Sequence, residues 1–112
     1  MKRIAILIIL VFLLLSSCYL TTNRTVQFYA NSTSDVVYGS YLTSIDSINH
    51  IFIDLSPPWS LDVEAEKGEY VLLTVSGDLA DALTARIYVD GDLFREKNET
   101  GVILIQVGGY IE

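Results

Sequence analysis

Residues 85–92 have the sequence Ala-Arg-Ile-Tyr-Val-Asp-Gly-Asp, and this short stretch predicts a β-hairpin. Its apolar residues alternate with polar ones, which is the period of a strand with one buried face. Asp90-Gly91 follows directly, and both central positions of a two-residue hairpin turn require a positive φ, which Asp and Gly tolerate. The chain is therefore expected to fold back after Val89 and to form the returning strand over residues 93–97.

The same alternation recurs along the chain on both sides of this hairpin. Polar turn clusters separate the segments, and Pro57-Pro58 ends one of them because Pro58 cannot donate to a ladder. Only residues 77–83 could form a helical turn. The expected strands are 26–30, 36–42, 48–55, 59–66, 70–75, 85–89, 93–97 and 102–107. Seven or eight short strands predict an all-β fold, a two-layer β-sandwich, with a small barrel as the alternative.

The alternation also predicts which side chains fill the core. Over residues 48–55, one face carries Ile51, Ile53 and Leu55. The other carries His50, Phe52 and Asp54, so His50 is expected on a solvated polar face. The residues expected in the core are Trp59, Leu61, Val71, Leu73, Ile87, Val89, Ile103 and Ile105.

The first eighteen residues are organised differently from the rest. A basic start, Met1-Lys2-Arg3, precedes an unbroken apolar run of 12 residues, and Leu15-Ser16-Ser17-Cys18 ends it with the only cysteine. This layout is typical of a secretory signal with a bacterial lipobox, cleaved before Cys18 and lipidated there with palmitate. The run would span roughly 18 Å as a helix, short of the bilayer core of about 30 Å. An uncleaved signal anchor is the alternative.

Three segments follow from this layout. Residues 1–17 are the expected lipoprotein signal peptide, which would form an N-terminal signal helix. Residues 18–25 are the lipidated cysteine and its tether, and residues 26–112 form one β-sandwich domain without disulfides. The expected location is the cell envelope. Because Tyr19 is not an aspartate, we expect the outer membrane in a diderm, and otherwise the outer face of the plasma membrane.

The charge of the chain restricts its partners. The formal charge is −7, and cleavage would remove two basic residues, leaving five basic side chains against fourteen acidic ones. Such a surface repels phosphate backbones, so nucleic acid is not an expected partner. It also gives no attraction to anionic lipids. Membrane contact is therefore expected through the lipid on Cys18.

Candidate chemical sites are few. His50 is the only histidine, and neither zinc-ligand spacing nor a glycine-rich phosphate loop is present. Asp78, Asp81 and the Asp90-Gly91-Asp92 turn could supply calcium ligands, but we interpret that turn as structural. We expect no metal, no cofactor and no enzymatic activity. The most distinctive polar residues are a candidate partner surface, namely Asp62, Glu64, Glu66, Asp90 and Asp92. Trp59 and the tyrosines could form a platform for sugars, so the alternative function is a module that binds an envelope glycan or polymer.

The run Leu55-Ser56-Pro57-Pro58-Trp59-Ser60, together with residues 85–92, resembles the immunoglobulin-like domain of the mycobacterial small membrane protein family, MmpS. The resemblance covers residues 50–107. It implies an immunoglobulin-like β-sandwich of about seven or eight strands and an accessory role beside lipid exporters of the RND type. The chain departs from that family by having a lipobox in place of a longer membrane helix. The expected function is a non-enzymatic binding or accessory module that contacts another envelope protein, such as a membrane transport complex.

Overall fold

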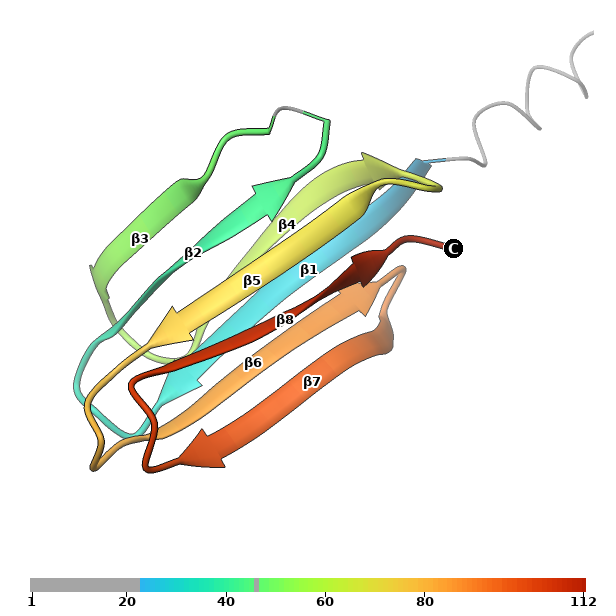
Figure 1. The fold of residues 1–112 in the computed structure, drawn as a ribbon. Helices are drawn as coiled ribbons and strands as arrows, with labels where there is room; N and C mark the ends of the chain where they lie inside the picture. The colour runs from blue at the N-terminus through green and yellow to red at the C-terminus, as the bar shows by residue number, and fades with distance from the viewer. Residues whose placement is uncertain (1–22, 46) are drawn as a thin grey trace, which may run out of the picture.

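The computed structural model describes residues 23–45 and 47–112, and there the chain forms eight β-strands in two four-stranded antiparallel sheets (Figure 1). The predicted signal segment and Cys18 lie outside these residues. In the described part, no helix has the length and apolar character needed to cross a membrane. The strands are β1 (Asn23–Ser32), β2 (Val37–Thr43), β3 (His50–Leu55), β4 (Trp59–Glu66), β5 (Tyr70–Ser76), β6 (Ala82–Val89), β7 (Asp92–Thr100) and β8 (Leu104–Tyr110).

The two sheets pack face to face as a sandwich, which confirms the all-β prediction. Sheet A has the strand order β4-β1-β6-β7, and sheet B has the order β3-β2-β5-β8. The chain changes sheet between β1 and β2, on each side of β4 and β5, and again between β7 and β8. Only β2–β3 and β6–β7 are hairpins between consecutive strands. This connectivity gives two separate sheets instead of the small barrel that the sequence left open.

Several strand boundaries differ from the predicted ones. β1 begins at Asn23, three residues earlier than expected, because its first residues pair with the end of β4. β7 continues to Thr100 through residues that looked like a turn, since the β6–β7 ladder runs on to the pair Ala82–Thr100. Residues 77–81 are a loop without a helix. The hairpin turn is confirmed, with φ values of 50° at Asp90 and 85° at Gly91.

The core lies between the two sheets and is built from alternate residues of their strands. Of the predicted core residues, Val71, Leu73, Ile87 and Ile105 are buried. Trp59, Leu61 and Val89 are half-buried, being near the sandwich edge or its ends. Ile103 was wrongly placed in the core: its exposed fraction is 64%. The chain is still turning between the sheets at this residue, and β8 begins only at Leu104.

The orientation of β3 also corrects the sequence analysis. Phe52 is the buried residue of this strand, whereas Ile51 and Ile53 are 74% and 63% exposed. His50 shares the inner side, where its ring stacks on Tyr41 with 4.8 Å between centroids. Aromatic rings are long enough to close the gap between edge strands β3 and β4, and Phe52 does so by stacking on Trp59 at 4.1 Å. His50 is half-buried on the inner side of sheet B, so the prediction of an outward, polar face for this residue is wrong.

Gly39 in β2 makes room for this arrangement. A Cβ atom at Gly39 would lie 2.0 Å from the carbonyl oxygen of Thr74 and 3.0 Å from the tip of the Phe52 ring. The glycine thus allows close approach of β5 and the inward position of Phe52.

Candidate functional site

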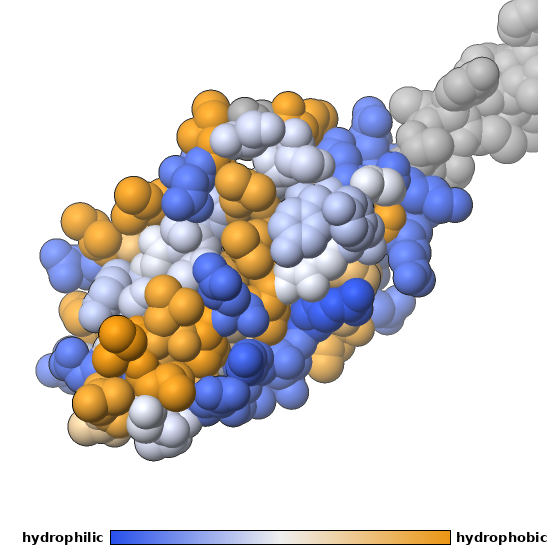
Figure 2. Space-filling model, in the orientation of Figure 1, coloured by the Kyte–Doolittle hydropathy of each residue, from blue (hydrophilic) through white to orange (hydrophobic). Residues whose placement is uncertain are grey.

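The two outward faces of the sandwich differ sharply in charge. Among the described strands, ten charged side chains belong to sheet A and only one, Asp54, belongs to sheet B. Figure 2 views the molecule from the sheet B side, where hydrophobic and weakly polar side chains cover much of the surface. Two surfaces of opposite character are therefore available for recognition.

The acidic surface lies on sheet A and consists of the predicted partner residues, Asp62, Glu64, Glu66, Asp90 and Asp92. Strand β4 turns its three carboxylates outward, in alternation with residues that face the core. Glu64 pairs with Thr25 of β1, and the backbone N–H of Thr25 is hydrogen-bonded to Asp90. The fold thus brings the β4 carboxylates and the hairpin tip, which are far apart in sequence, to one end of sheet A.

Asp90 has a structural task within this surface. Its Oδ1 accepts a hydrogen bond from the backbone N–H of Thr25 at 2.9 Å, and its Oδ2 lies 3.5 Å from Arg24 Nε. The backbone N–H of Asp90 donates to the Thr25 carbonyl oxygen at 2.8 Å. These bonds fasten the β6–β7 turn to the start of β1. Asp92 is exposed, so it is the tip carboxylate better placed to meet a partner.

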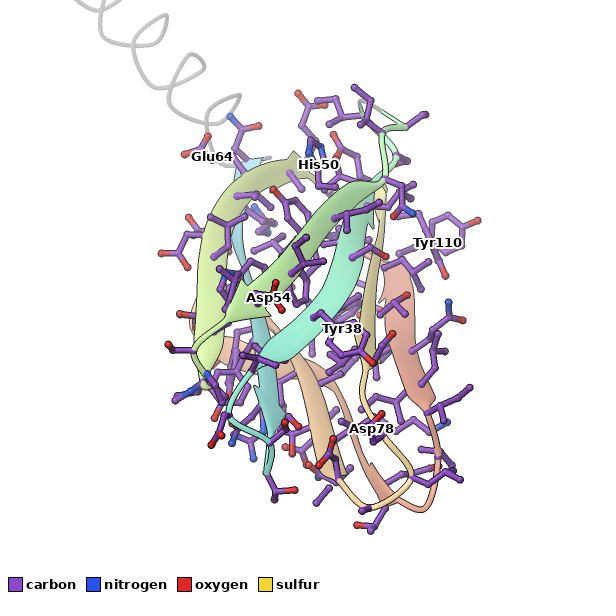
Figure 3. The ribbon with its side chains drawn as sticks, turned by 90° about the vertical axis from the view of Figure 1, so that its left-hand side faces the viewer. Tyr38, His50, Asp54, Glu64, Asp78 and Tyr110 are labelled. Carbon is purple, nitrogen blue, oxygen red and sulfur yellow. The ribbon has the colours of Figure 1, made fainter. Side chains whose placement is uncertain are left out.

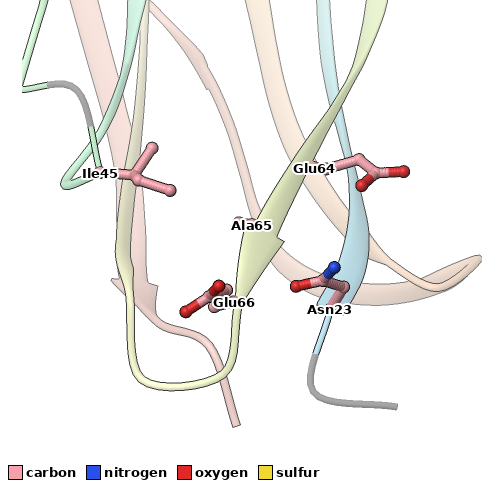
Figure 4. Close-up of a pocket in the computed structure, with 5 residues that line it drawn as sticks. All are labelled: Asn23, Ile45, Glu64, Ala65 and Glu66. Atoms are coloured by element: carbon pink, nitrogen blue, oxygen red, sulfur yellow. The ribbon is translucent and has the colours of Figure 1, made fainter. Parts of the chain in front are cut away.

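A hollow of about 200 Å³ opens beside the acidic surface (Figure 4). It is lined by Asn23, Ile45, Glu64, Ala65 and Glu66. Glu64 and Glu66 both lie on the outward side of β4, but in this view their side chains extend away from each other, so the two carboxylates do not converge on one point. Ligand pockets usually enclose about 300–1,000 Å³. The hollow therefore suits a contact with one side chain of a partner better than a small-molecule ligand.

The residues considered for metal or acid–base chemistry are not brought together. His50 lies at one end of the sandwich and Asp78 at the other (Figure 3). Asp78 and Asp81 precede β6 and Asp90 follows it, so these carboxylates are separated by the length of that strand. Asp81 Oδ2 accepts a hydrogen bond from the backbone N–H of Asp78 at 3.0 Å. Within the described residues, no group of three His, Cys, Asp or Glu side chains could hold a metal ion.

Arg86 and Lys97 of sheet A are paired with carboxylates on its surface. Arg86 donates to Glu96 on the neighbouring strand, and this hydrogen bond raises the pKa of the Arg86 guanidinium. The same guanidinium lies 5.1 Å from the ring centre of Tyr29. On β7, Lys97 Nζ lies 3.6 Å from Glu99 Oε1. Charges of this kind keep an edge strand such as β7 from pairing with another chain.

Sheet B presents a second surface, the neutral face, which sequence analysis missed. It consists of the outward side chains Tyr38, Ser40, Leu42, Ile51, Ile53, Tyr70, Leu72, Thr74, Ser76, Leu104, Gln106 and Tyr110. The strand register sets them in rows, one of which is Ile51–Ser40–Thr74–Gln106. In that row Gln106 Nε2 donates to Thr74 Oγ1 at 3.1 Å, so its polar groups are partly satisfied within the face.

Two signals in the sequence could have revealed the neutral face. Isoleucines that alternate with Phe52 on a strand imply an apolar residue on each side. The strands of sheet B also lack charge, but only the strand order shows that they are neighbours. No protein-family model matches this chain, and no curated protein matches it in a sequence search.

Proposed function

We propose that this chain is a lipid-anchored protein of the bacterial cell envelope that acts as a non-enzymatic binding or accessory module for another envelope protein. The observation that carries the proposal is the separation of an acidic surface on sheet A from a neutral face on sheet B. Broad surfaces of distinct character favour recognition of macromolecules. The pair of four-stranded sheets is consistent with the sandwich domain that the MmpS resemblance implies. A membrane transport complex is the partner suggested by that resemblance alone.

The short tether would place the acidic surface next to the membrane. β1 begins at Asn23, and the five residues from Cys18 to Asn23 reach at most about 18 Å when extended. The start of β1 shares its end of the sandwich with Glu66 and the hairpin tip (Figure 1). Anionic lipid would repel these carboxylates, so a basic segment of a membrane protein is the partner chemistry that fits them.

The alternative, an envelope glycan- or polymer-binding module, has weaker support. Trp59 was its main candidate, but this ring stacks on Phe52 and lies 6.0 Å from Tyr41. Both contacts belong to the aromatic cluster that closes the edge of the core, so they reduce the ring area open to a sugar. Tyr38 and Tyr110 are the exposed rings that such a ligand would have to use.

The lipid anchor is tested by metabolic labelling. Cells that express the full chain are grown with labelled palmitate, beside cells that express Cys18→Ser. We expect label on the parent protein and none on the variant, with the variant keeping its signal peptide. A parent protein that takes up no palmitate would refute the anchored part of the proposal.

The binding role is tested by capture of the full chain from intact cells after mild crosslinking. A variant with Asp62, Glu64 and Glu66 changed to serine should lose most of the captured partner. The matched control changes the exposed carboxylates of Asp35, Asp78 and Glu112 to serine, so the net charge shifts equally. Equal capture by both triple variants would show that the acidic surface does not bind the partner. Recovery of polysaccharide in place of protein would favour the alternative.

A further inference from the structure

The neutral face of sheet B is broad, and Ile51, Ile53 and Tyr110 are among its strongly exposed side chains. It is the best candidate for a contact that the fold itself does not make. We propose that it packs against the same face of a second copy of this chain. The result is a two-fold dimer with both lipid anchors in one membrane. The inference rests on the anchor in the proposed function, and it leaves the acidic surface free for the partner.

The side chains of the face have the character of an interface. Tyr110 is 68% exposed, and Leu104 and Tyr38 are also open to solvent. Tyr70 and Tyr110 pair edge to face at 5.1 Å, so these two rings are already held in position. Tyrosine is enriched where proteins meet because its ring adds contact area with little loss of entropy.

The charge distribution favours the neutral face over the other broad face of the sandwich as the place where two copies meet. After cleavage the chain has a formal charge near −9, so two copies repel unless they meet where charge is absent. Packing of sheet A on sheet A would oppose the β4 carboxylates. On sheet B the charged exception is Asp54, which lies in the bulge of edge strand β3 and so at the margin of the contact.

The size of the face is adequate for a dimer confined to a membrane. Its strands have six or seven residues each. Four such strands about 4.8 Å apart, at about 3.3 Å per residue, present roughly 440 Å² in projection. Standard interfaces bury about 800 Å² of accessible surface per partner. Protruding side chains raise the accessible area above the projected area, and the shared membrane raises the effective concentration.

The direction of the strands fixes the arrangement. Sheets that pack in the aligned mode cross at about −30°. If the two-fold axis runs along the strands, both copies begin β1 at the same end, and both tethers can enter one bilayer. The reversed arrangement would put the two tethers at opposite ends. Edge-to-edge pairing through β3 would also reverse them, and the bulge at Ile53–Asp54 blocks that edge.

Single-cysteine crosslinking of the full chain in its native membrane tests the dimer. Cys18 is the only cysteine, and lipidation occupies its thiol, so an added cysteine is the one free thiol. Ser40→Cys lies on a central strand of the neutral face. Ser60→Cys, on β4 of sheet A, is the matched control because both serines point outward from a strand. With a short bis-maleimide, Ser40→Cys should form a species of twice the mass and Ser60→Cys should remain monomeric.

A charge placed in the face should break the contact. Ile51→Glu in the Ser40→Cys background is expected to reduce the dimer band several-fold, since the two glutamates would enter an uncharged interface. Leu79→Glu, on an exposed loop outside the face, is the control and should leave the band unchanged.

Two results would overturn the inference. One is a palmitate-labelled Ser40→Cys protein that stays monomeric, and the other is a protein that crosslinks chiefly to a different chain. A missing palmitate label would instead refute the anchor, so the two failures can be told apart.

Discussion

Replacing Phe52 or its neighbour Ile51 with alanine tests the orientation of β3, which is the main difference between the expected and observed core. The two residues are adjacent on one strand but face opposite sides of sheet B. Phe52→Ala should strongly destabilise the fold, whereas Ile51→Ala should change the free energy of unfolding by less than about 0.5 kcal/mol, as expected for an exposed site.

The magnitude for Phe52 follows from its contacts. The ring is 6% exposed and stacks on Trp59 with an angle of 19° between planes. Burying roughly 150 Å² of ring surface at about 25 cal/mol per Å² contributes about 3–4 kcal/mol. The lost stacking adds about 1 kcal/mol. Because β3 is an edge strand, its surroundings can partly close over the gap, so we expect about 3–4 kcal/mol for the substitution.

Urea unfolding of purified protein measures both effects. Trp59 is the only tryptophan, and its fluorescence reports on the ring that Phe52 covers. Circular dichroism should follow the same transition. The orientation of β3 would be wrong if Phe52→Ala cost less than about 1 kcal/mol, or if Ile51→Ala cost as much as Phe52→Ala.

Three further substitutions make distinct predictions for the same unfolding assay. Gly39→Ala should cost at least about 3 kcal/mol, because its methyl group would collide with the Thr74 carbonyl oxygen; a neutral result would contradict that packing. Asp90→Ala should cost about 1–2 kcal/mol, since it removes the bond to Thr25 and places alanine at a positive φ. Ile103→Ala should stay within about 0.5 kcal/mol of the parent, and a large loss would return Ile103 to the core.

Sequence analysis predicted buried residues best on the central strands, where a neighbouring strand lies on each side. Ile87 lies on a central strand of sheet A and Leu73 on a central strand of sheet B, so each has neighbours on both sides. In β3, both sets of alternate positions contain a large apolar residue, Phe52 in one and Ile51 in the other, and periodicity cannot tell which set faces inward. The choice depended on the ring of Trp59 across the edge and on the space left by Gly39.

In the candidate site too, some features followed from local sequence and others depended on the strand order. The outward direction of Glu64 and Glu66 followed from their alternation with Val63 and Ala65. Their closeness to Asp90 did not, because it depends on β1 lying between β4 and β6. The bond from Asp90 to Thr25 joins residues 65 positions apart, and no local pattern reports such a contact.

Local chemistry was sufficient for the all-β class, for the hairpin at Asp90-Gly91 and for the acidic outer side of β4. These properties depend on side-chain alternation and on backbone preferences, which act over a few neighbouring residues. The tertiary structure decided the assignment of strands to sheets, the inward face of β3 and the existence of an uncharged face on sheet B. Each of these depends on which distant strands become neighbours, because burial and charge segregation are properties of a whole sheet and not of one strand.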